Sequence, residues 1–102
     1  MTYVYFIQQG YGAIKIGVSD DPDKRCSDMQ TGSSKRLRVV ARIPMEDRRQ
    51  AMNLEKELHA AFSSLRIRGE WFNRRIIRNG KMKKMFSGTL KNPTVRIQGS
   101  ST

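Results

Sequence analysis

Residues 3–18, YVYFIQQGYGAIKIGV, constrain the fold of this chain more than any other stretch. Two short apolar runs, YVYFIQ at 3–8 and AIKIGV at 13–18, are rich in the β-branched and aromatic residues that favour strands. The four residues between them, QGYG, include two glycines and predict a turn. The segment therefore predicts a β-hairpin, and with it an antiparallel start to a sheet.

The pattern within the hairpin also predicts which strand residues face each other. Pairing Phe6 with Ile14 puts the apolar side chains of both strands on one face, whereas a shift by one residue would mix the faces. In this register Tyr5 lies directly opposite Lys15 on the other face, with Cβ atoms about 4.5–5.5 Å apart. The sequence thus predicts a tyrosine–lysine pair on the sheet.

Further elements follow the hairpin. Capping residues and an early proline predict a short helix, and an alternation of basic and apolar residues that ends at Pro44 predicts a third strand. An apolar stripe at helical spacing predicts a longer helix, and a glycine-containing turn then leads into an extended segment. These elements are expected at residues 22–31, 36–43, 46–65 and 69–73. The expected fold class is α/β, with a small three-stranded antiparallel sheet flanked by helices.

The charge of the chain is strongly positive and unevenly distributed. Lys and Arg number 20 against 9 Asp and Glu, and the net charge of +11 favours a polyanionic partner, nucleic acid first and an anionic membrane surface second. All 9 acidic residues lie within residues 1–70, and from Trp71 onward there are only basic charges. We therefore expect a domain at residues 1–73 and a basic C-terminal arm with a flexible tail at 74–102.

The basic arm is expected to contact nucleic acid through its phosphates, with DNA as the favoured partner. Residues 74–86 predict a short basic helix, and the Gly-, Ser- and Thr-rich composition from Ser87 onward predicts a loose tail. The arm has no zinc-finger or recognition-helix pattern, so strong sequence specificity is not implied. The cations expected to bind nucleic acid are Arg74, Arg75, Arg78, Lys81, Lys83 and Lys84.

Cysteine and histidine usage bounds the compartment and the metal chemistry. The sequence has neither a signal segment nor an apolar run as long as a membrane span, which predicts a cytoplasmic protein. If a phage encodes it, the expected compartment is the cytoplasm of the host cell. The single Cys26 makes no internal disulfide, as in a reducing compartment. One Cys and one His exclude the usual zinc clusters, so a metal here is expected to be hard and oxygen-ligated, such as Mg²⁺ or Mn²⁺.

Several motifs occur along the chain in a characteristic order, namely YVYFIQ, IKIG, DPDKR, MQTG, LEKELHAAF and GEWF. In that order they resemble the GIY-YIG nuclease superfamily, most closely its compact phage and bacterial branch. The resemblance covers residues 3–73 and leaves residues 74–102 outside. It implies an antiparallel sheet and a divalent-metal-dependent endonuclease that hydrolyses phosphodiester bonds, one strand per active site. Whether the chain acts as a monomer or a transient dimer stays open.

The resemblance also implies roles for individual residues, matched by position. The implied catalytic residues are Tyr5, Lys15, Arg25 and Glu55, with Glu55 as the metal ligand and His59 and Asn73 as candidate accessory residues. Many members carry a histidine four residues after the arginine, where this chain has Met29. Without it, proton transfer falls to Tyr5, Lys15 or water unless His59 takes the role.

The chemistry of phosphodiester cleavage suits these residue types. A phenol with a pKa of about 10 is a poor base at neutral pH, and Lys15 beside Tyr5 would favour the phenolate, although Lys15 could itself be the base. Arg25 offers a planar fork of donors for a phosphate, and Glu55 is a hard ligand for Mg²⁺. Taken singly, each residue also fits an ordinary structural or solvated role. The alternative is therefore a catalytically inactive nucleic-acid-binding module on the same fold, and a membrane-surface protein is a weaker third.

Overall fold

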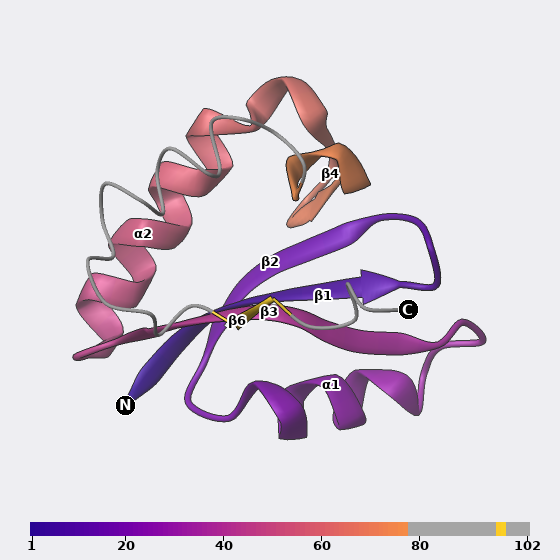
Figure 1. Cartoon of the computed structure of the whole chain (residues 1–102), viewed down its shortest axis with the longest axis horizontal. Coiled ribbons are helices and arrows are strands. Elements are labelled where there is room, and N and C mark those ends of the chain that lie inside the picture. The colour runs from indigo at the N-terminus through magenta and orange to yellow at the C-terminus, as the bar shows by residue number, and fades with distance from the viewer. Residues whose placement is uncertain (78–95, 98–102) are drawn as a thin grey trace.

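The computed structural model describes residues 1–77 and the backbone of residues 96–97. Its strands form one antiparallel sheet in the order β4-β5-β2-β1-β3-β6, with α1 against one face and α2 against the other (Figure 1). The strands are β1 (Thr2–Gln9), β2 (Ile14–Ser19), β3 (Leu37–Met45), β4 (Arg66–Arg68), β5 (Trp71–Phe72) and β6 (Arg96–Ile97). The helices are α1 (Pro22–Gln30) and α2 (Arg48–Ala61), with 3₁₀ turns at Ser63–Leu65 and Arg74–Ile76.

The α/β class and the antiparallel sheet are confirmed, but three strands were too few. Five strands come from residues 1–77, and the two-residue β6 adds to the outer edge of β3. β4 and β5 contain three and two residues. Strands so short have no periodicity that a sequence pattern could reveal, because alternation needs about four residues to be recognised. Long-range pairing with β2 is what makes β5 a strand.

The hairpin register differs from the predicted one by two residues. Phe6 pairs with Ile16 instead of Ile14, and Tyr5 lies opposite Gly17 instead of Lys15. The turn closes with a hydrogen bond from the backbone N–H of Gln9 to the carbonyl of Ala13, 2.9 Å long. Side chains alternate with a period of two, so a shift of two leaves every residue on its predicted face. The hydrophobic pattern therefore determined the faces but not the partners.

The sheet separates two apolar cores because its central strand is buried on both sides. Val4 and Phe6 of β1 face α2, while Tyr5 and Ile7 face α1. The core under α2 is larger and includes Leu54, Leu58, Phe62, Phe72 and Ile76; the core under α1 includes Cys26, Leu37 and Val39. This two-sided burial explains why β1 is apolar almost without interruption.

Both helices begin at an aspartate that caps the first turn. The Asp21 side chain accepts a hydrogen bond from the Lys24 N–H and the Asp47 side chain accepts one from the Gln50 N–H. The long helix ends at Ala61, earlier than the predicted residue 65, because the chain tightens into the 3₁₀ turn that leads to β4. The caps fix where each helix starts.

Candidate functional site

Lys15 forms an ion pair at the outer edge of β2. Its Nζ lies 2.8 Å from Oε1 of Glu70, and the Lys15 side chain is only 14% exposed. Its ammonium also lies 5.8 Å from the centroid of the Trp71 ring, within cation–π range. The carbonyl of Glu70 accepts a hydrogen bond from the Ile16 N–H, so the backbone at Glu70 continues the pairing of β5 with β2. Lys15 is thus held in place by two partners rather than solvated.

Glu55 and His59 lie on the flank of α2 that faces this same edge. Glu55 and His59 are one helical turn apart, beside the buried stripe of Leu54 and Leu58. His59 Nε2 lies 3.2 Å from the carbonyl oxygen of Ile16, and the imidazole packs edge-on against Phe72 with centroids 4.9 Å apart. A carbonyl can only accept, so this bond requires the proton on Nε2 and leaves Nδ1 as the unprotonated nitrogen of the neutral ring.

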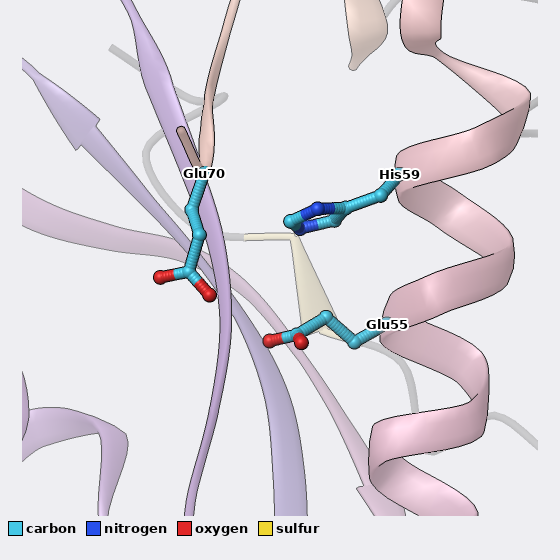
Figure 2. Close-up of side chains that lie close together, drawn as sticks. All are labelled: Glu55, His59 and Glu70. Carbon is cyan, nitrogen blue, oxygen red and sulfur yellow. The ribbon is translucent and has the colours of Figure 1, made fainter. Parts of the chain in front are cut away.

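Glu55, His59 and Glu70 converge in one place, as Figure 2 shows. One donor atom from each lies within 4.8 Å of the others, and all three side chains are half-buried. Two carboxylates and an imidazole are a donor set that a divalent cation can use. Sequence reasoning proposed Glu55 alone as a ligand and gave Glu70 no role. The GEWF motif was the available signal, since its glutamate directly precedes β5.

The electrostatics of this cluster act on Glu55. Desolvation by burial raises the pKa of the Glu55 carboxyl above its usual range, and the negative charge of Glu70 raises it further. His59 and Lys15 act in the opposite direction without cancelling the effect. Burial and the charge of Glu70 therefore disfavour the ionised form of Glu55, and a bound cation would favour that form.

With cations removed by EDTA, Glu55→Gln should stabilise the fold at pH 7 and lose this advantage at pH 4. A carboxyl whose pKa is higher in the folded state binds protons more tightly when folded. Its favourable contribution is therefore complete below the unfolded pKa of Glu and is lost as the pH rises through the folded pKa. Urea unfolding at both pH values measures the difference. Glu57→Gln, which removes an exposed carboxylate from the same helix, is the matched control. A Glu55→Gln variant less stable than wild type at pH 7 would contradict the burial argument.

Tyr5 lies on the α1 side of the sheet and is 2% exposed. Its ring extends across Gly17, where an added Cβ would meet Oη and would lie 2.5 Å from Cζ. The phenol therefore reaches from β1 over β2. The predicted direct pair with Lys15 is wrong, because Lys15 lies opposite Ile7 and is a diagonal neighbour of Tyr5 on the same face.

The Arg25 side chain is exposed on α1, and its guanidinium has no hydrogen bond or ion pair with any described residue. The direction in which Arg25 projects from the helix can be inferred from that of Asp23. The Asp23 carboxylate faces β3, since it accepts two hydrogen bonds from Arg42 of that strand at 3.1 and 2.6 Å. These bonds lower the pKa of Asp23. Residues two positions apart are about 200° apart around a helix, so Arg25 lies on the flank away from β3, on the side of β2.

The predicted catalytic residues border the outer edge of β2 from both faces of the sheet. Glu55 belongs to α2, whereas Arg25 belongs to α1 and Tyr5 packs in the core under α1. The two helices cover opposite faces of the sheet (Figure 1). The Lys15–Glu70 ion pair lies at the edge of β2 where the pairing with β5 begins. The structure thus groups Lys15 with Glu55 and His59 around Glu70. It does not place Tyr5 or Arg25 in contact with Glu55.

Asn73, a candidate accessory residue, and Met29, which stands where many members have a histidine, both make contacts within the fold. The Asn73 side chain accepts a hydrogen bond from the Arg75 N–H at 2.9 Å and caps the 3₁₀ turn that follows. Met29 packs against the α1-side core. Trp71 lies against the α1-side core, while Phe72 packs under α2. Neither Asn73 nor Met29 adds a polar group to the edge of β2.

The predicted nucleic-acid-binding cations fall only partly within the described residues. Arg74 and Arg75 are exposed, and Arg74 Nη1 donates a hydrogen bond to the carbonyl of Tyr11, 3.3 Å long. Arg78, Lys81, Lys83 and Lys84 lie outside the described residues, as does the predicted tail. Within the described part of the chain, neither helix is long and apolar enough to cross a membrane.

Comparison with known families gives one match. A family model described as the T5orf172 domain matches residues 2–88. No curated protein and no solved structure matches the chain. The matched range includes every residue of the cluster at the edge of β2, together with residues 74–86.

Proposed function

The chain belongs to the T5orf172 domain family, a family of nuclease type, and from this premise we propose that it is a divalent-cation-dependent DNA endonuclease that cuts one strand per active site. The observation that carries the proposal is the grouping of Glu55, His59 and Glu70 beside Lys15 at the edge of β2. The net charge of +11 supports a nucleic-acid substrate. The GIY-YIG-like chemistry expected from the motif order is part of this proposal.

Glu55, with the donor atoms of His59 and Glu70 beside it, is the group that would hold the cation, Mg²⁺ or Mn²⁺ in the simplest case. When bound, such a cation supplies positive charge that polarises the scissile phosphate. Lys15 already lies at the edge of β2, so its ammonium would contact a phosphate placed there. Both groups would stabilise negative charge that develops on the phosphate oxygens.

Arg25 and Tyr5 would act on the same phosphate from the α1 side. The guanidinium of Arg25 is free among the described residues and would bind a phosphate in bidentate fashion. Between Tyr5 and Lys15 as the base, the ion pair of Lys15 with Glu70 favours Tyr5, because Lys15 is engaged as a positive charge. In this proposal the DNA backbone follows the edge of β2 and meets both faces of the sheet there.

A catalytically inactive nucleic-acid-binding module is the second candidate. The observation that favours it is the separation of Glu55 from Tyr5 and Arg25 by the sheet, which would leave the chemistry incomplete. Met29, in the position of a frequent histidine, is consistent with it. Such a module would keep the affinity for DNA and lack cleavage.

Nicking of supercoiled plasmid DNA tests the proposal. Wild-type protein should convert supercoiled plasmid into the open circle with Mg²⁺ or Mn²⁺ and should not do so with EDTA. Arg25→Ala should lower the rate about 10- to 100-fold, because a charge-assisted phosphate contact is lost. Lys24→Ala is the matched control, since it removes a neighbouring cation that is paired with Asp28. Tight DNA binding by wild type without nicking would favour the inactive module.

A further inference from the structure

We infer that Glu55, His59 and Glu70 act together as a three-donor site that binds a first-row transition dication in preference to Mg²⁺. The inference deepens the proposed function and rests on it, because it names the class of cation that the same site takes. It also changes the expectation from sequence, which was a hard cation held by oxygen alone. The difference is made by one nitrogen, that of His59.

The first support is that the donors are held in place by the sheet. Ile16 is fully buried in β2, and its N–H donates to the carbonyl of Glu70 at 3.0 Å, while its carbonyl lies 3.2 Å from His59 Nε2. A single buried residue therefore anchors the helix donor and the turn donor. Glu55 adds its carboxylate one helical turn before His59, on the same flank of α2 (Figure 2).

The second support is the spacing of the donor atoms. They lie within 4.8 Å of one another without an ion. Donors bound to one cation at about 2.0–2.2 Å are at most about 4.4 Å apart. Side-chain rotations of Glu55 and Glu70 would close this gap without movement of the backbone, since both side chains have several rotatable bonds. The site is thus close to a coordinating arrangement before any cation binds.

The third support is the orientation of the imidazole. Histidines that bind metals commonly donate their other ring N–H to a carbonyl or carboxylate, which fixes the tautomer. His59 makes this bond to Ile16, which places the proton on Nε2 and the lone pair of the neutral ring on Nδ1. Mg²⁺ prefers oxygen ligands and keeps much of its water, whereas imidazole suits cations such as Co²⁺, Ni²⁺ and Zn²⁺.

Lys15 acts as a positioning residue in this site. Its Nζ bonds Oε1 of Glu70, which leaves Oε2 for the cation. The two carboxylates and the ammonium together carry one net negative charge, which attracts a dication. Because Lys15 is itself paired with Glu70, a dication at the Glu70 carboxylate would not meet an unpaired cation there. The ion pair also keeps Glu70 directed toward the edge of β2 when the site is empty.

The single histidine of the chain makes a sharp experiment feasible. In tag-free protein, the imidazole signals in an NMR spectrum belong to His59 alone. Titration with Co²⁺ should shift and broaden these signals at a stoichiometry of one, and calorimetry should show Co²⁺ binding at least about tenfold tighter than Mg²⁺. His59→Gln should weaken Co²⁺ binding about 10- to 100-fold and leave Mg²⁺ binding within about twofold.

The controls separate this inference from the proposed function. Glu57→Gln, an exposed carboxylate on the same helix, should bind Co²⁺ as wild type does, whereas Glu70→Gln should lose affinity while circular dichroism shows a retained fold. Unchanged Co²⁺ affinity in His59→Gln, or equal affinity of wild type for Mg²⁺ and Co²⁺, would overturn the inference. Tight, His59-dependent Co²⁺ binding without plasmid nicking would support the site and count against the nuclease alone.

Discussion

Glu55→Gln is expected to slow strand cleavage about 100- to 1,000-fold while leaving DNA affinity within about twofold. The Glu55 carboxylate is the metal ligand implied by the motif order, and it is also part of the cluster with His59 and Glu70. Its loss therefore weakens the binding of the cation on which the chemistry depends. The glutamine keeps the size of the side chain and its place beside the buried stripe of α2. Plasmid nicking at fixed cation concentration gives the rate, and fluorescence anisotropy gives the affinity.

Slower cleavage by Glu55→Gln is not expected to come from loss of the fold. The raised pKa of Glu55 means that its charge opposes folding at pH 7, so the variant should be at least as stable as wild type. Glu57→Gln should cleave at the wild-type rate, because this exposed side chain lies outside the cluster. Cleavage by Glu55→Gln at half the wild-type rate or more would rule out Glu55 as an essential ligand.

Gly17→Ala is expected to destabilise the fold by about 3 kcal/mol, a large fraction of the free energy of unfolding of a small domain. The added Cβ would meet the hydroxyl of Tyr5 and would lie 2.5 Å from Cζ of the same ring. The ring is 2% exposed and packs beneath α1, so it has no free space to enter. Thermal or urea unfolding followed by circular dichroism measures the loss.

Two comparisons assign this effect to the contact between Gly17 and Tyr5. Gly32→Ala is the matched control, since a Cβ there would have no neighbour closer than 3.9 Å, and its cost should stay below about 1 kcal/mol. In a Tyr5→Ala background, the added methyl should cost far less than it does in wild type, which a double-mutant cycle quantifies. Equal cost in both backgrounds would show that the strain has another source.

Much of the fold followed from local pattern. The hairpin, the two helices and the third strand are near their predicted positions, because alternation, caps and a helical stripe are properties of neighbouring residues. The prediction that Phe6 and Tyr5 lie on opposite faces of β1 was also correct, and the structure places Phe6 on the α2 side and Tyr5 on the α1 side. The strand count was wrong because β4 and β5 are too short to carry a pattern.

The candidate site was predictable only in part. Motif order pointed to Lys15, Glu55 and His59, which the structure groups at one edge. It did not indicate Glu70, whose carboxylate reaches Lys15 across 55 positions of the chain. The arrangement of the predicted residues on two faces of the sheet was likewise not visible in the sequence, because it depends on how α1 and α2 cross the sheet.

The sequence by itself determined the elements, the face that each strand residue takes, and a positive charge suited to a polyanion, since each of these depends on composition or on nearest neighbours. Only the tertiary structure decided that Tyr5 lies over Gly17, that Lys15 meets Glu70, and that an imidazole joins two carboxylates. The reason is physical: a register shift of two preserves every face, and the pairing of β2 with β5 joins segments that carry no local signal for each other.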